Sequence, residues 1–175
     1  MEAENVYSFP VLNEQTCTTL SAEIDSYRQL THDSGIALPL SSIGLDIFFK
    51  DLVSHIHPIL SSLYPQLSNY DTYPKLVSNR LFPTKTSLIQ MTYEKLNNED
   101  WPKHNDGDLA TLNLCLSKDF EGTELRLFEK DKFVDYVHRI GRMIVVLGDN
   151  KHAVTSLKKG RRYSVIIKLN NKPKI

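Results

Sequence analysis

The sequence has few cysteines and no long apolar run. Its two cysteines, Cys17 and Cys115, lie far apart within apolar patterns, which argues against the disulfide framework of a small secreted domain. The longest fully apolar run, Met143–Leu147, is far too short to span a bilayer. The acidic first residues are not followed by the apolar stretch of a secretory signal. We therefore expect reduced core cysteines in a cytoplasmic or nuclear protein without a membrane segment.

The chain also lacks net charge and the glycine-rich motifs of nucleotide-binding enzymes. Lys and Arg total 21, as do Asp and Glu, so the formal net charge is 0. This removes the general attraction to nucleic acid or to an anionic membrane, and we expect neither as a partner. There is no Gly-rich phosphate loop and no GxSxG nucleophile elbow. With 175 residues, 41% hydrophobic and 24% charged, the chain has the composition of one ordinary globular domain.

The first part of the chain has helical periodicity. After Asn13, a suitable N-cap, apolar residues recur in steps of three and four as far as Tyr27, which predicts one amphipathic helix. A second helical pattern runs from Leu45 to Leu63. It contains Pro58, which we expect to kink the helix or to begin a new one.

From residue 76 onward the periodicity changes to that of short strands separated by turn-rich segments. This pattern is typical of an all-β sandwich or barrel. We expect a single domain, 1–175, with a helical support region in 1–75 and a β core in 76–175. The predicted strands are Leu76–Phe82, Ser87–Tyr93, Leu109–Leu116, Glu124–Phe128, Lys132–Val137, Arg142–Leu147 and Arg162–Leu169.

Histidine and carboxylate side chains stand at short spacing. His104 and Asp106 are two residues apart, and His152 follows the predicted strand 142–147. In an extended segment residues i and i+2 point to the same side, so His104 and Asp106 can reach one ion. Two histidines and one carboxylate are the ligands of non-haem Fe(II) oxygenases, because they leave positions open for co-substrate and dioxygen. A zinc hydrolase could use the same ligands, although no glutamate general base stands at motif spacing.

A basic residue follows this set. Arg162 stands ten residues after His152 and opens a predicted strand whose alternation puts Arg162, Ser164 and Ile166 on one face. A guanidinium that projects into an apolar barrel needs an anionic partner, and its planar fork suits a carboxylate. Arg162 is therefore predicted to anchor an acidic co-substrate, whereas Arg161 is expected to be a solvated turn charge.

The order of these motifs resembles the 2-oxoglutarate- and Fe(II)-dependent dioxygenases of the prolyl/lysyl hydroxylase-like branch, in particular the C-terminal catalytic domain of procollagen lysyl hydroxylases. One departure is Thr123, since relatives have two consecutive glycines in this turn. The match extends less specifically upstream through 8–20 and 56–67 to Tyr93. The resembling segments are HND (104–106), ATLNLCLSKDFEGTEL (110–125), GR (141–142), His152 and GRRY (160–163).

The resemblance implies a double-stranded β-helix, a cupin-like jelly roll, with N-terminal helices packed on its major sheet. It implies an oxidoreductase that uses Fe(II), 2-oxoglutarate and ascorbate as reductant to hydroxylate Lys or Pro in a protein or peptide. The implied site residues are His104, Asp106 and His152 as iron ligands, Arg162 at the distal carboxylate of 2-oxoglutarate, and Tyr93 and Asn113 beside it.

Other interpretations remain open at this point. Tyr93 fits a packed core aromatic as well, and Asn113 fits a buried amide with its hydrogen bonds satisfied. The substrate could be a free amino acid or another small molecule. A catalytically silent binding module could keep the same jelly roll.

Overall fold

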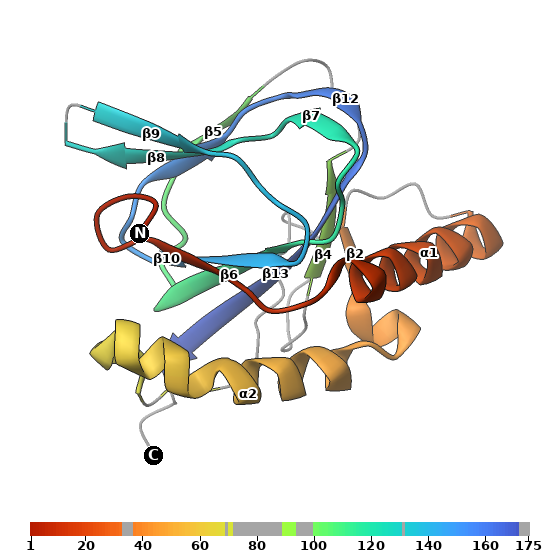
Figure 1. The fold of residues 1–175 in the computed structure, drawn as a ribbon, viewed down its shortest axis with the longest axis horizontal. Coiled ribbons are helices and arrows are strands. Elements are labelled where there is room, and N and C mark those ends of the chain that lie inside the picture. The colour runs from red at the N-terminus through yellow and green to blue at the C-terminus, as the bar shows by residue number, and fades with distance from the viewer. Residues whose placement is uncertain (33–36, 69, 72–88, 94–99, 131, 172–175) are drawn as a thin grey trace.

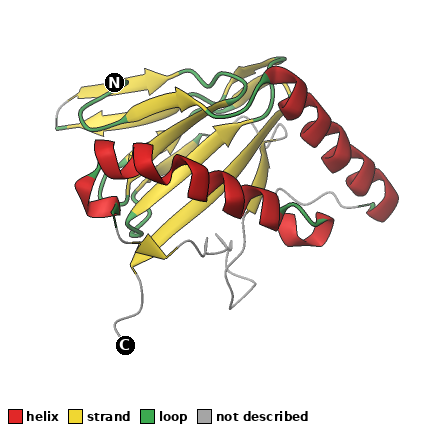
Figure 2. Cartoon of the chain, turned by 60° about the horizontal axis from the view of Figure 1, so that its bottom comes forward, coloured by secondary structure: helices red, strands yellow, loops and turns green. Residues whose placement is uncertain are grey.

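Two antiparallel sheets face each other, and two helices cover the outer side of one sheet (Figures 1 and 2). This arrangement is seen in a computed structural model that describes residues 1–32, 37–68, 70–71, 89–93, 100–130 and 132–171. It is the jelly-roll architecture with N-terminal helices that the sequence predicts.

The helices are α1 (Glu14–Thr31) and α2 (Asp46–Leu63), with short 3-10 turns at Leu40–Ile43 and Pro65–Leu67. The side chain of Asn13 caps α1 as predicted, because it accepts a hydrogen bond of 2.8 Å from the backbone N–H of Thr16. The expectation that Pro58 begins a new helix is wrong, since α2 continues through it. Pro58 is exposed, so the carbonyl that loses its helical donor lies on the solvent side.

No described helix has both the length and the apolar character needed to cross a membrane.

The major sheet has the strand order β1-β10-β6-β13-β4-β2, and β3 pairs with β13. The minor sheet has the order β5-β11-β8-β9, and β12 pairs with β7. The strands of the major sheet are β1 (Tyr7–Pro10), β2 (Ala37–Pro39), β3 (Tyr70–Asp71), β4 (Ile89–Tyr93), β6 (Ala110–Cys115), β10 (Arg142–Leu147) and β13 (Arg162–Asn171). The others are β5 (Trp101–His104), β7 (Phe120–Gly122), β8 (Leu125–Glu129), β9 (Lys132–Tyr136), β11 (His152–Val154) and β12 (Leu157–Gly160).

The longer strands lie where the sequence predicts them, whereas the short ones were missed. Strands β6, β8, β9, β10 and β13 match their predicted ranges within two residues. The predicted strand 76–82 falls outside the described residues, as do the first two residues of the predicted strand 87–93. Strands β1 and β2, both within the region expected to be helical, pair with β10 and β4. The boundary between a helical region and a β core at residue 75 stays a prediction.

The fold has two apolar layers, one on each side of the major sheet. On the outer side, Tyr163, Val165, Ile167 and Leu169 of β13 pack with buried residues of α1 and α2. Between the sheets, a smaller cluster joins residues of β8 and β10. The alternation predicted for β13 is therefore confirmed, and the other face of β13 borders the space between the sheets.

Candidate metal centre and co-substrate pocket

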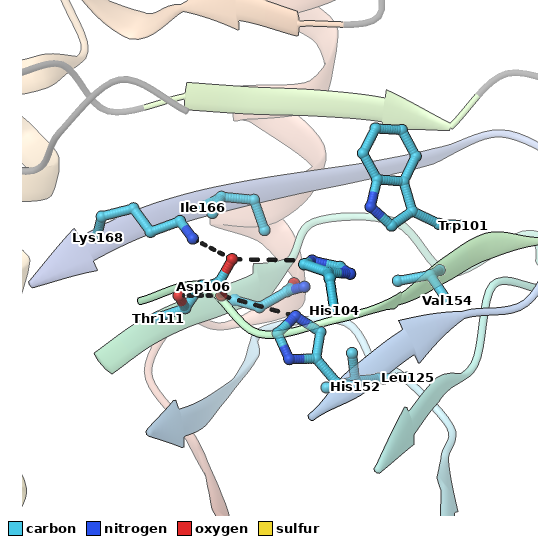
Figure 3. Close-up of a pocket in the computed structure, with 10 residues that line it drawn as sticks. Trp101, His104, Asp106, Thr111, Leu125, His152, Val154, Ile166 and Lys168 are labelled. Atoms are coloured by element: carbon cyan, nitrogen blue, oxygen red, sulfur yellow. Dashed lines mark hydrogen bonds and ion pairs between the residues drawn. The ribbon is translucent and has the colours of Figure 1, made fainter. Parts of the chain in front are cut away.

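His104, Asp106 and His152 come together at one end of the space between the sheets (Figure 3). His104 ends β5, Asp106 lies in the turn before β6, and His152 begins β11 directly opposite His104 in register. One potential ligand atom from each residue lies within 4.8 Å of the others. The Nε2 atoms of His104 and His152 lie 3.8 and 3.6 Å from the two carboxylate oxygens of Asp106. A first-row metal with bonds of about 2.0–2.2 Å holds its ligands at about this spacing.

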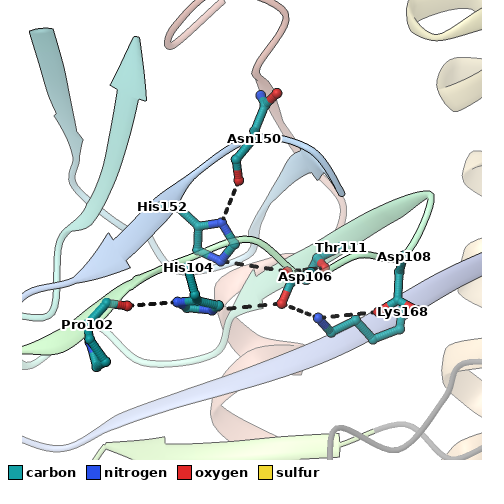
Figure 4. A network of polar contacts seen from close by, with 8 residues as sticks. All are labelled: Pro102, His104, Asp106, Asp108, Thr111, Asn150, His152 and Lys168. Carbon is teal, nitrogen blue, oxygen red and sulfur yellow. Dashed lines mark hydrogen bonds and ion pairs between the residues drawn. The ribbon is translucent and has the colours of Figure 1, made fainter. Parts of the chain in front are cut away.

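Backbone carbonyls set the protonation of both imidazoles. The Nδ1 atom of His104 lies 2.8 Å from the carbonyl oxygen of Pro102, and that of His152 lies 3.0 Å from the carbonyl oxygen of Asn150 (Figure 4). A carbonyl can only accept, so Nδ1 carries a proton in both rings, and Nε2 is the nitrogen that faces Asp106 and can bind a metal. Burial lowers the pKa of His152, which favours its neutral form.

The carboxylate of Asp106 is contacted from both sides. Thr111 donates a hydrogen bond to Oδ2, and the ammonium of Lys168 forms an ion pair with Oδ1. Burial by itself raises the pKa of Asp106, but the positive charge of Lys168 and the hydrogen bonds from Lys168 and Thr111 outweigh it and bring the pKa below the usual value. The carboxylate is therefore ionised, and the Nε2 atoms of two imidazoles face it. This donor set fits a divalent transition metal ion.

A cavity of about 70 Å³ adjoins the three residues. Asn113 lines it, is buried, and has an amide oxygen without a hydrogen-bond partner among the described residues. The role predicted for Asn113 stays a prediction. The cavity is lined by Trp101, His104, Asp106, Thr111, Asn113, Leu125, His152, Val154, Ile166 and Lys168.

Arg162 is wholly buried on the inner face of β13, beyond the lining of this cavity. Its guanidinium donates through Nε to the hydroxyl of Ser164 at 2.9 Å and through Nη1 to the carbonyl of Thr123 at 2.8 Å. Thr123 has a left-handed backbone, with φ of 56°, which costs energy in a β-branched residue. The turn that departs from the double-glycine pattern thus contacts the predicted anchor directly.

Tyr93 is known here only by its backbone, since its side chain lies outside the described residues. It pairs with Arg162 in the register of β4 and β13, so the two residues share a position across the sheet. Arg161 is exposed and forms an ion pair with Asp25 of α1, in accord with its prediction as a solvated charge. The role predicted for Tyr93 stays a prediction.

Beside the predicted anchor lies a buried histidine, His138, which is 5% exposed. Its Nε2 has no hydrogen-bond partner among the described residues. Burial, reinforced by the charge of Arg162, holds the pKa of His138 well below its usual 6.5.

This shift gives the stability a pH dependence of definite sign. The unfolded chain binds a proton at His138 below about pH 6.5 and the folded chain does not, so stability falls as the pH drops through that value. We expect His138→Gln to reduce this fall in the free energy of unfolding by up to about 1.4 kcal/mol per pH unit. Urea unfolding at pH 6.5 and 5.5 measures the free energy at both pH values, with His55→Gln on the exposed surface of α2 as the control. Equal slopes in wild type and His138→Gln would contradict this assignment.

Lys168 is the residue of this site that the sequence analysis missed. It continues the alternation of Arg162, Ser164 and Ile166 by one more step, so the signal was present in the sequence. Thr111 could have been found in the same way, because it shares a face of β6 with Asn113. Thr111 and Lys168 lie opposite each other in the register of β6 and β13.

No protein-family model matches the chain. It is 25% identical over 188 aligned residues, 93% of its length, to the 2-oxoglutarate and iron-dependent oxygenase domain-containing protein ICU11 of Arabidopsis thaliana. It is 27% identical over 182 residues, 95% of its length, to the 2-oxoglutarate and iron-dependent oxygenase domain-containing protein 2 of Mus musculus. The chain is thus similar in sequence to proteins named as 2-oxoglutarate- and iron-dependent oxygenases. It spans 44% and 49% of these two proteins, about half of their length.

Solved structures of such oxygenases share the fold. A prolyl 4-hydroxylase from Phytophthora capsici superposes with a TM-score of 0.70 at 17% identity, over 97% of this chain and 60% of that one. A prolyl hydroxylase from Trichoplax adhaerens, solved with a hypoxia-inducible factor peptide, gives 0.60 at 15% identity, over 97% and 84%. The predicted jelly roll is thus confirmed, and the sequence similarity agrees with the predicted relation to these oxygenases. The lysyl hydroxylase branch stays a prediction.

Proposed function

We propose that the chain is an Fe(II)- and 2-oxoglutarate-dependent hydroxylase that acts on a Pro or Lys side chain in a protein or peptide. The observation that carries this proposal is the convergence of two imidazole Nε2 atoms on one ionised carboxylate, at His104, His152 and Asp106. The similarity to proteins named as 2-oxoglutarate and iron-dependent oxygenases selects this chemistry over a zinc hydrolase.

Each group of the site has a part in this proposal. His104, Asp106 and His152 would hold Fe(II), which with 2-oxoglutarate supplies the oxidation of a C–H bond by dioxygen, with succinate and carbon dioxide as products. The carbonyls of Pro102 and Asn150 orient the two imidazoles. Arg162 and its partner Ser164 offer a buried cation and a hydroxyl for the distal carboxylate of the oxoacid. Asn113 offers an amide oxygen that accepts no hydrogen bond from the part of the chain that the structure describes.

A peptide substrate is supported by the shape of the site and by the neighbours. The side chain of His104 is 34% exposed and that of His152 only 9%, so the site opens on the His104 side. Trp101 stands beside His104 on this side, with ring centroids 6.4 Å apart (Figure 3). An opening at the surface admits a side chain presented by a larger molecule. The neighbours that share the fold include prolyl hydroxylases, one of them bound to a peptide.

The proposed reaction is tested by succinate formation. Incubated with Fe(II), ascorbate and 2-oxoglutarate, the protein should form succinate slowly, and a true substrate should accelerate it. Peptides that contain Pro or Lys are compared with the free amino acids, and the products are examined by mass spectrometry. A gain of one oxygen atom on a peptide would establish the proposal and identify the residue.

Other outcomes of this experiment point elsewhere. A gain of oxygen on a free amino acid would replace the peptide substrate by a small molecule. If iron-loaded protein formed no succinate with any of these compounds, the proposal would fail in favour of a silent binding module. A variant with the ligand removed, His152→Ala, corrects for succinate formed by iron in solution.

A further inference from the structure

Lys168 places a positive charge against the candidate metal ligands. Its Nζ forms the ion pair with Oδ1 of Asp106 and lies 3.5 Å from Oδ2 of Asp108 (Figure 4). The residue is 4% exposed and lines the cavity together with the three candidate ligands. A buried ammonium that lines a cavity is expected to affect any charged species that enters it.

Within this cluster, the ammonium of Lys168 opposes a bare cation and favours an anion. A divalent ion held by Asp106 would bring two positive charges close to the ammonium of Lys168, in a buried site where such repulsion is weakly screened. A carboxylate that binds the same ion would add negative charge in the same cavity and offset this repulsion. The ammonium of Lys168 therefore repels the metal ion and attracts the anion.

We propose that Lys168 couples the binding of the metal to the binding of the anionic co-substrate. It weakens the binding of a bare divalent ion and strengthens the complex in which a carboxylate ligand is also present. By thermodynamic linkage, the factor by which the anion tightens the metal equals the factor by which the metal tightens the anion. The inference rests on the proposed function, because it takes Asp106 as a ligand of the metal.

Calorimetric titration of the metal-free protein with Mn²⁺, with and without saturating 2-oxoglutarate, measures this coupling without any turnover. In Lys168→Met, we expect Mn²⁺ alone to bind about tenfold more tightly than in wild type. The tightening of Mn²⁺ by 2-oxoglutarate should also shrink by about tenfold, because the cation that links the two is gone.

Three further variants test whether the positive charge of Lys168 is the cause of the coupling. Lys168→Arg keeps the positive charge and should retain the coupling. Lys159→Met removes an exposed lysine that pairs with Glu121 and should leave both affinities unchanged. Lys168→Met leaves Asp106 and Asp108 without their shared cation, so the double variant Asp108→Asn with Lys168→Met guards against a failure to fold. It should show the same reduced coupling as the single variant.

The outcomes distinguish this inference from the proposed function. If wild type binds no Mn²⁺ at all, both the metal site and the coupling fail. If wild type binds Mn²⁺ and 2-oxoglutarate tightens it, but the folded Lys168 variants show the same affinities and the same coupling, only the inference is overturned. Weaker binding of Mn²⁺ alone to Lys168→Met and to the double variant would also overturn the inference, because Lys168 would then merely support Asp106.

Discussion

Replacing Asp106 with alanine is expected to abolish stoichiometric Fe(II) binding, and His104→Ala should do the same. Each change removes one of the three protein donors that, among the described residues, converge on the site. Loss of a residue that merely supports a ligand typically costs 10–100-fold in metal affinity, so loss of a ligand should cost more than about 100-fold. Metal content after anaerobic loading and desalting measures the effect, with one ion per chain expected for wild type.

The control is another histidine of the same chain. His55 lies exposed on α2, and His55→Ala should keep the full metal content. Thermal unfolding of the metal-free proteins verifies that the variants fold. Normal iron stoichiometry in folded His104→Ala and Asp106→Ala would remove the assignment of the metal centre.

Replacing Arg162 with methionine is expected to weaken the binding of 2-oxoglutarate by on the order of 30-fold or more. The physical reason is that truncating one partner of a buried charge pair costs about 2–5 kcal/mol. Arg162 is fully buried, so water cannot replace it beside the carboxylate. Titration of the Mn²⁺-loaded protein with 2-oxoglutarate measures the dissociation constant.

The neighbouring arginine provides a matched comparison. Arg161 carries the same charge but is exposed and pairs with Asp25, so Arg161→Met should leave the binding of 2-oxoglutarate unchanged. Arg162→Lys keeps the charge without the planar fork and should lie between wild type and Arg162→Met. Equal effects of Arg161→Met and Arg162→Met would mean that the inner face of β13 does not bind the co-substrate.

The parts of the fold that the sequence predicts are those with a long enough periodic signal. Helix α1 with its Asn13 cap and the long strand β13 each repeat their pattern several times. Strands β7 and β11 have only three residues, too few for alternation to be visible. The expected break at Pro58 was wrong because the cost of a proline inside a helix depends on which side of the helix faces water, and packing decides that.

The candidate site shows a similar division. The HxD pair and His152 stand out in the sequence because residue type and spacing alone suggest a ligand set. The ion pair of Lys168 with Asp106 joins two residues that are 62 positions apart, and only the pairing of β13 with β6 brings them together. Alternation alone places Lys168 on the inner face, but the sequence does not say which acidic residue meets it.

The alignment of the polar site along β13 depends on the apolar residues of the opposite face of this strand, which line no part of the cavity. One face of the strand packs under α1 and α2, and the other carries Arg162 and Lys168. A slip of one residue along β13 would replace Ile166 and Lys168 in the cavity lining by their apolar neighbours and would turn Arg162 and Lys168 toward the helices. The helices thus fix the alignment of the two charges, and the loops around the opening can diverge toward new substrates while that alignment is preserved.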